Sequence, residues 1–161
     1  MIEVEEQQKN KIAANFENGE VTLPRKGRLV VTISKESLCS LLLFLKMDGF
    51  EHLSLISCVD WLGEGELELV YHLWSYQKKI HAMVKTRIDR ESPHFLSIIP
   101  LFRHAQTYER EIYEMFGVRF EGNRRLIPFL LDNWQGAPPM RKDFDLRKYV
   151  KEKFDVEERA E

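Results

Sequence analysis

The sequence predicts an α+β fold, a mostly antiparallel sheet covered by helices, with an extended C-terminal arm. Three observations lead to this fold class. Apolar and polar residues alternate over several short stretches between 20 and 87, which is the period of half-buried strands. Two segments, 35–48 and 97–116, repeat apolar residues at helical spacing. After 117, prolines and glycines interrupt the apolar residues, so long regular elements are not expected there.

The N-terminal part is expected to form a weak helix, two strands and a stronger helix. Residues 1–16 are polar with isolated apolar positions, which favours a weak helix ahead of the domain. Between 20 and 34 the alternation is broken by a proline and a glycine, which predicts strand, turn and strand. Ser34 is suited to cap the helix over 35–48, and Gly49 is suited to end it.

The middle of the chain predicts a run of antiparallel strands. Residues 52–62 form an apolar stretch that enters a turn at 63–65. The alternation over 67–71 then predicts a hairpin with one buried face. A further alternating stretch at 79–87 adds a strand, so at least three antiparallel neighbours are expected in a row.

The last predicted helix, over 97–116, contains an unusually placed carboxylate. At about 100° per residue, Glu109 projects into the apolar arc of this helix, whereas Glu111 lies at the margin of the arc. Arg110 and Glu114 lie on the opposite side. Their i and i+4 spacing predicts an exposed ion pair contributing about 0.2–0.5 kcal/mol.

Glu109 needs a partner, because a buried and unpaired carboxylate would cost several kcal/mol. The expected partners are a cation such as Arg119, Arg141 or Lys142, a backbone amide, or a bound group. We interpret Glu109 first as a structural carboxylate that fixes the tail. Catalysis, or a contact between Glu109 or Glu111 and a basic residue of another chain, are the alternatives.

The length of 161 residues and the 43% hydrophobic content fit one globular domain with a sizeable core. We place this α+β domain at 1–117 and the arm at 118–161. The arm contains Phe129, Leu130, Leu131 and Trp134, whose side chains have to leave water. We expect the protein's own sheet and another subunit to cover them, so the arm is predicted to dock on a partner.

Composition excludes several function classes. A net charge of −2 argues against nucleic-acid binding, which needs a concentrated basic face. The longest apolar runs, such as 41–45, are too short for a membrane span, and the acidic N-terminus is unlike a secretion signal. Two cysteines, Cys39 and Cys58, cannot ligate an iron–sulfur cluster alone, since the common clusters take four thiolates.

No catalytic, cofactor-binding or metal-binding residues are expected in this chain. The five histidines, which include His72 and His81, show no zinc-ligand spacing. These two are placed to face each other across a hairpin, but a strand histidine is more often hydrogen-bonded than a ligand. The turn Gly63-Glu64-Gly65 lacks the third glycine and the helix of a dinucleotide-binding loop.

Several short segments, taken in order over most of 53–144, resemble one known family. They are SCVDW (57–61), YHL (71–73), 97–102, EREIYEMFG (109–117), FEG (120–122) and PPMRKDF (138–144). Together they are similar to the thirty-kilodalton subunit of respiratory complex I, a family that includes the equivalent subunit of membrane-bound nickel–iron hydrogenases. The helix followed by a tail ending in Arg-Lys-Asp is the specific part of this match.

The resemblance implies a non-catalytic, hydrophilic peripheral-arm subunit that supports assembly and electron transfer coupled to ion pumping. Its partners would be a large catalytic subunit, of the forty-nine-kilodalton or hydrogenase large-subunit type, and iron–sulfur subunits. Iron–sulfur clusters and a nickel–iron centre would belong to those partners, and the complex would place the chain peripherally on the cytoplasmic side of the cell membrane. The implied interface residues, with Trp134 added from the apolar tail, are Glu109, Arg110, Glu111, Tyr113, Phe116, Gly117, Trp134, Arg141, Lys142 and Asp143.

Two departures from the family pattern refine this interpretation. Many complex I members read Gly-His-Pro and then Leu-Arg-Arg after the helix, whereas this chain has Gly122-Asn123-Arg124-Arg125-Leu126. They also tend to have Leu where this chain has Met140. These changes favour an archaeal-type hydrogenase or a sulfur-linked relative. A small standalone hydrolase using Glu109 or Glu111 with a histidine, and a generic adaptor outside respiration, are the alternative functions.

Overall fold

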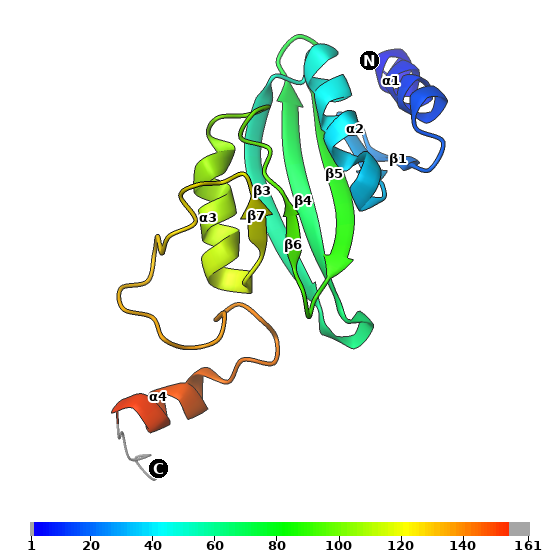
Figure 1. The fold of residues 1–161 in the computed structure, drawn as a ribbon. Helices are drawn as coiled ribbons and strands as arrows, with labels where there is room; N and C mark the ends of the chain where they lie inside the picture. The colour runs from blue at the N-terminus through cyan, green and yellow to red at the C-terminus, as the bar shows by residue number, and fades with distance from the viewer. Residues whose placement is uncertain (1, 155–161) are drawn as a thin grey trace.

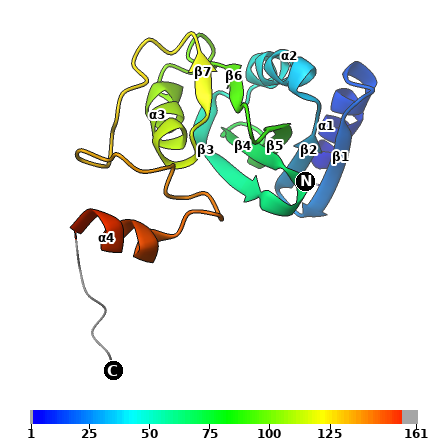
Figure 2. The same cartoon turned by 60° about the horizontal axis from the view of Figure 1, so that its bottom comes forward.

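A computed structural model describes residues 2–154, in which a five-stranded sheet carries helices α2 and α3 on one face (Figures 1 and 2). The elements follow one another as α1 (Ile2–Asn15), β1 (Glu20–Arg25), β2 (Arg28–Thr32), α2 (Lys35–Met47), β3 (His52–Trp61), the 3-10 turn η1 (Leu62–Glu64), β4 (Glu66–Ser75), β5 (Ile80–Asp89), β6 (His94–Leu96), α3 (Ala105–Phe116), β7 (Arg119–Glu121) and α4 (Leu146–Phe154). The α+β class expected from the sequence is therefore confirmed.

The sheet has the order β1-β2-β5-β4-β3 and is mixed. β3, β4 and β5 are antiparallel neighbours, as the alternation predicts. β2 and β5 are parallel, which the sequence did not reveal. The parallel pair arises because β2 leads through α2 to β3 at the far edge, and the β3-β4-β5 meander then returns to β2.

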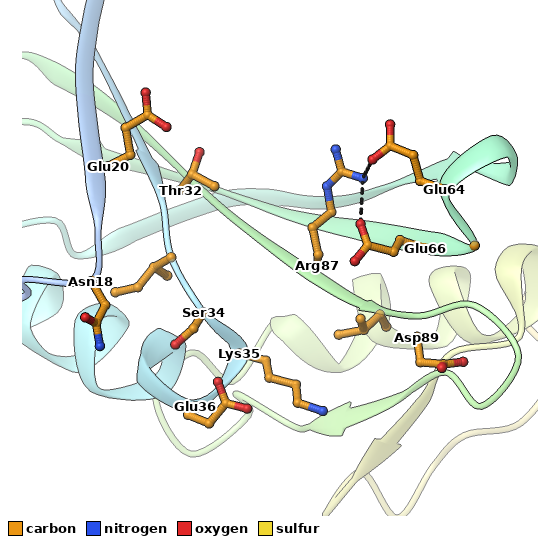
Figure 3. Close-up of a pocket in the computed structure, with 13 residues that line it drawn as sticks. Asn18, Glu20, Thr32, Ser34, Lys35, Glu36, Glu64, Glu66, Arg87 and Asp89 are labelled. Atoms are coloured by element: carbon orange, nitrogen blue, oxygen red, sulfur yellow. Dashed lines mark hydrogen bonds and ion pairs between the residues drawn. The ribbon is translucent and has the colours of Figure 1, made fainter.

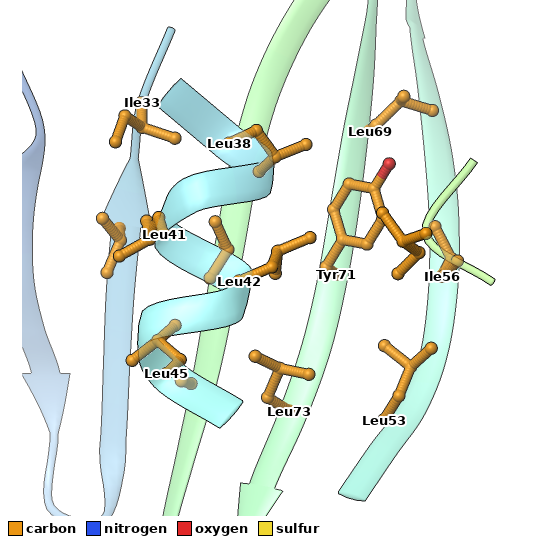
Figure 4. Packing of buried hydrophobic residues seen from close by; sticks show 14 of the residues in the cluster. Ile33, Leu38, Leu41, Leu42, Leu45, Leu53, Ile56, Leu69, Tyr71 and Leu73 are labelled. Atoms are coloured by element: carbon orange, nitrogen blue, oxygen red, sulfur yellow. The ribbon is translucent and has the colours of Figure 1, made fainter. Parts of the chain in front are cut away.

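The core lies between the sheet and the helices. Figure 4 shows Leu42 of α2 directed towards Tyr71 of β4, and Leu41 on the side of the helix nearer to β2. The side chains of Leu41, Leu42, Leu45, Tyr71 and Leu73 are all fully buried. Each buried leucine is worth about 1.5–3 kcal/mol relative to an exposed one. The alternation of β4 thus places Tyr71 and Leu73 on the face covered by helices, but the prediction of a single buried face is wrong, because Glu68 and Val70 on the other face are buried too.

Two local expectations differ from the structure. The helix predicted over 97–116 begins only at Ala105, because Pro100 lies in the preceding turns and the Ser97 N–H donates to the Glu121 carbonyl at 2.8 Å. β6 instead pairs in parallel with β7. The side chain of Ser34 makes no capping hydrogen bond to α2.

The arm begins with residues that still belong to the core. Val118 is fully buried and Phe120 nearly so, and the irregular backbone follows them. It passes beside α3 and ends in α4, which the sequence analysis missed (Figure 1). Residues 155–161 of the predicted arm lie outside the described part of the chain. No helix within residues 2–154 is long and apolar enough to cross a membrane.

Candidate functional site

Helix α3 carries five of the ten predicted interface residues, and a sixth, Gly117, ends it. This glycine has a φ of +81°, and its N–H donates to the Tyr113 carbonyl at 2.9 Å. A Cβ here would lie 3.0 Å from Cγ of Pro138. Gly117 therefore ends the helix in the left-handed conformation and also lets the arm pass close to it.

Glu109 is fully buried, as the helical spacing predicts. Its oxygens accept hydrogen bonds from the Ser97 hydroxyl at 2.8 Å, the Ile98 N–H at 2.8 Å and the Asn123 side-chain amide at 2.9 Å. Burial raises the pKa of the Glu109 carboxyl, and the three hydrogen bonds oppose this shift. The carboxylate thus joins α3 to the chain just after β6 and to the chain after β7 through neutral donors alone.

The cations expected beside Glu109 lie elsewhere, so that expectation is wrong, and the backbone-amide alternative is confirmed by Ile98. Arg119 is exposed on β7, and the Lys142 side chain is also exposed. Arg141 is bound to two backbone carbonyls instead. Helical spacing determined which side of α3 faces the core, but it carried no information about which distant residue would meet Glu109.

A second buried group joins the arm to the sheet through Arg90. Its Nε lies 2.7 Å from Oδ1 of Asp60, and its Nη2 lies 3.1 Å from Oδ2 of Asp60 and 2.6 Å from Oδ1 of Asp143. The Lys142 N–H donates to Asp60 at 2.8 Å. Hydrogen bonding to Arg90 lowers the pKa of both Asp60 and Asp143. A short buried pair of this kind holds the arm by charge as well as by geometry.

Arg141 completes this attachment. Its Nε donates to the Phe116 carbonyl at 2.8 Å and its Nη2 to the Arg90 carbonyl at 3.1 Å. We call Asp60, Arg90, Arg141 and Asp143 the arm latch. Two of the implied interface residues, Arg141 and Asp143, therefore bind their own chain, and their contribution to assembly would be to position the arm.

Arg110 and Glu114 do not form the ion pair expected from their spacing. Arg110 donates to the carbonyls of Ile127 at 3.3 Å and Pro128 at 3.0 Å. Glu114 accepts from the N–H groups of three consecutive residues, 129–131, at 2.7–3.2 Å. Both side chains point away from the core, but they are engaged with the arm's backbone and not with each other.

Trp134 lies in a small aromatic cluster within the arm. Its ring is 5.6 Å from that of Phe144 and 4.5 Å from that of Tyr149 in α4, measured between centroids. Its Nε1–H donates to the Ala137 carbonyl at 3.0 Å. Trp134 is therefore half-buried against its own arm, while the α3 residue Glu111 is exposed.

The predicted histidine pair is confirmed. His72 Nδ1 and His81 Nε2 lie 3.3 Å apart on β4 and β5, and burial lowers the pKa of His72 to about 4. Within residues 2–154, no three His, Cys, Asp or Glu side chains gather as a metal site would require. The structure also has an open depression of about 800 Å³, and Figure 3 shows Arg87 bridging Glu64 and Glu66 at its edge.

Sequence reasoning missed four residues that organise the site, namely Asp60, Arg90, Ser97 and Asn123. Asp60 and Ser97 lie within segments that carry the family resemblance, but neither segment indicates a partner. Arg90 directly follows β5, and no feature of the sequence indicates that it belongs to the site. Only the folded chain brings it from the end of β5 to the arm.

Comparison with known proteins identifies a family and several relatives. Residues 31–150 match the family model described as "Respiratory-chain NADH dehydrogenase, 30 Kd subunit". The chain is 40% identical over 97 residues to the C subunit of the F(420)H(2) dehydrogenase of Methanosarcina mazei, an alignment spanning 60% of this chain and 61% of that protein. It is 38% identical over 132 residues to the C subunit of the NADH-quinone oxidoreductase of Neorickettsia sennetsu, spanning 81% and 71%. The chain thus spans about two thirds of the length of these relatives.

Two solved structures share the fold. A chain in the structure of the membrane-bound sulfane sulfur reductase, an archaeal respiratory membrane complex, superposes with a TM-score of 0.88 at 36% identity and covers 97% of this chain and 94% of that one. A trypsin-resistant fragment of Nqo5 superposes with a TM-score of 0.64 over 75% of this chain, and at 24% identity it shows the likeness of fold alone. The first likeness extends through the arm as well as the sheet.

Proposed function

The chain belongs to the family of the respiratory-chain NADH dehydrogenase 30 Kd subunit, and from this membership we propose that it is a non-catalytic peripheral subunit of a membrane-bound oxidoreductase complex. The observation that carries the proposal is the likeness to a chain of the sulfane sulfur reductase complex over 97% of this chain. A sulfur-reducing complex is accordingly the type we favour, in agreement with the two departures from the complex I pattern.

In this proposal the partners are a large catalytic subunit and iron–sulfur subunits, which hold the redox centres, on the cytoplasmic side of the membrane. The chain would fix the geometry of these neighbours so that electrons pass between their centres and ion pumping is coupled to the transfer. The geometry supports such a role because the polar groups of the site hold the arm in place. Large apolar side chains of the arm, Phe129 at 42% and Leu130 at 56% exposure, remain uncovered.

The hydrolase alternative is not favoured. Both oxygens of Glu109 are occupied by donors of the chain itself, and the side chain has no access to solvent. Glu111 is exposed on the outer side of α3. A general acid or base must reach the substrate, and Glu109 does not meet this condition.

The test is purification of the tagged full-length chain from native membranes. We expect it to copurify in constant ratio with a large subunit and iron–sulfur subunits identified by mass spectrometry, and to migrate with the intact complex on native gels. Deletion of its gene should remove the assembled complex. A tagged chain that purifies alone, with the complex intact in the deletion strain, would contradict the proposal.

A further inference from the structure

The segment after the core, residues 124–131, has a backbone that is held unusually well for an irregular loop. Five hydrogen bonds from two α3 side chains reach it, two from Arg110 and three to Glu114. The Arg125 N–H also donates to Oδ1 of Asn123 at 3.0 Å. The Asn123 side chain in turn binds Glu109, so the buried carboxylate and the loop belong to one continuous network.

Holding the backbone in this way turns apolar side chains towards solvent. Ile127 and Leu130 are each 56% exposed. Phe129 is 42% exposed, and the guanidinium of Arg110 lies 4.7 Å from its ring centroid. Fixing a loop before it binds reduces the conformational entropy lost on binding. A loop that is both apolar and fixed is therefore suited to docking.

The charge at the N-terminal end of this segment is positive, whereas the exposed Asp132 follows its last residue. Arg124 and Arg125 are both exposed, and neither guanidinium has an ion-pair partner within residues 2–154. The acidic group of α3 that contacts the loop, Glu114, is already engaged with its backbone. An apolar surface bordered by two free arginines is complementary to an apolar surface bordered by carboxylates.

We propose that residues 124–131, the docking loop, insert Ile127, Phe129 and Leu130 into an apolar depression on a partner protein whose rim carries carboxylates that meet Arg124 and Arg125. This deepens the proposed function and rests on it. Arg110 and Glu114 are positioning residues in this scheme, because they act by holding the loop's backbone.

Paired variants of the full-length chain test the proposal in the native host. Ile127→Glu/Leu130→Glu changes the apolar part, and Met47→Glu is its control because Met47 is 81% exposed on α2. Arg124→Glu/Arg125→Glu reverses the charge of the two loop arginines. Its control is Arg25→Glu/Lys26→Glu, which reverses another adjacent pair of exposed basic residues, at the β1–β2 turn. Thermal unfolding of each purified chain shows whether the fold is kept.

The measurement is the amount of tagged chain retained on the solubilised membrane complex during washes of rising salt concentration. We expect both loop variants to lose retention by at least about tenfold and the two controls to retain the chain as the wild type does. Reversal of the arginines should also remove most of the salt dependence. Equal retention of loop variants and controls would overturn the docking loop, whereas absence of the wild-type chain from the complex would overturn the proposed function itself.

Photo-cross-linking identifies the occupant. With p-benzoylphenylalanine in place of Leu130, the adduct in the native complex should contain a peptide of another subunit with apolar residues flanked by Asp or Glu. Adducts to phospholipid, to a second copy of the chain or to a peptide with basic flanks would each overturn the proposal. So would a yield no higher than that from the same residue placed at Met47.

Discussion

Glu109 and Asp60 are both buried carboxylates that tie irregular backbone to the domain, but they are stabilised in opposite ways. Asp60 is 3% exposed and faces the guanidinium of Arg90. Glu109 has no exposure, and its partners are a hydroxyl, a backbone N–H and a side-chain amide. Arg90 lowers the pKa of Asp60, whereas burial raises the pKa of Glu109.

This comparison shows that burial alone does not determine how much a carboxylate contributes to the stability of the fold. Asp60 is part of the arm latch, where loss of one ion leaves another buried ion unpaired. Glu109 depends on neutral donors, so its removal leaves only neutral groups unsatisfied. The two positions should therefore differ in how much a substitution costs and in how stability changes with pH.

The largest effect is expected from Arg90→Met. This change leaves Asp60 buried without its cation, which should lower the free energy of unfolding by about 3–5 kcal/mol. Urea or guanidinium denaturation of the purified chain measures it. The double variant Arg90→Met/Asp60→Leu is the control, because replacing both ions by apolar groups should recover much of the loss. A single variant as stable as the wild type would show that the latch contributes little.

A smaller effect is expected at Glu109. Glu109→Ala removes the acceptor of three hydrogen bonds and should cost about 1–3 kcal/mol in free energy of unfolding. Glu109→Gln keeps an acceptor for Ser97 and Ile98 but places a second amide donor beside Asn123, so its cost should be lower. The same denaturation series measures both variants, with the exposed neighbour Glu111→Ala as control. A larger cost for Gln than for Ala would contradict the hydrogen-bond assignment.

The sequence showed which face of a helix or strand is buried far better than it showed which distant residues contact each other. Helical spacing was sufficient to bury Glu109, and strand alternation was sufficient for the β3-β4-β5 meander and for the meeting of His72 with His81. Neither pattern reports on residues that meet across the fold. Arg90 meets Asp60 only because β5 and β3 end at the same side of the sheet.

The same limit applies to local boundaries and to the interface. The helix predicted from 97 begins at Ala105 because Ser97 is used by Glu109 and Glu121, two contacts that no local period encodes. The exposed ion pair expected between Arg110 and Glu114 was wrong because the arm returns to α3. Which of the implied residues touch a partner stays a prediction, since assembly involves surfaces outside this chain.

The pH dependence should separate the two carboxylates by sign. The lowered pKa of Asp60 stabilises the fold above its unfolded pKa of about 3.9, and this contribution is lost as pH falls through the lower folded value. The raised pKa of Glu109 acts the other way. Its contribution is fully present below about pH 4.3 and is lost as pH rises through the higher folded value.

The measurement is the denaturation midpoint of the wild type, Glu109→Gln and Asp60→Asn at a series of pH values from neutral to below about 4. As the pH falls from neutral through the raised folded pKa of Glu109, the wild type should gain stability relative to Glu109→Gln, because only the wild type can protonate this site. Below about pH 4, the wild type should lose stability relative to Asp60→Asn. The wild type and each variant share all other carboxylates, so the effect of these groups on the pH dependence cancels when the stability of a variant is subtracted from that of the wild type. If the difference in stability between the wild type and Glu109→Gln does not change with pH, the two carboxylates do not differ in the way proposed.

The smallest effect is expected from Asp143→Asn, at the exposed end of the latch. The side chain of Asp143 is 52% exposed although its oxygen lies 2.6 Å from Arg90. Solvent screening limits such a pair to about 0–1 kcal/mol, and Arg141 and the Lys142 N–H still hold the arm. Global unfolding should therefore hardly change, while limited proteolysis between 124 and 145 should become faster than in the wild type.

Arg141→Gln is the comparison, since it removes the donor to two carbonyls and should release the arm further. Equal proteolysis of all three chains would mean that the arm is held chiefly by Asp60 and by the contacts of Arg110 and Glu114 with its backbone.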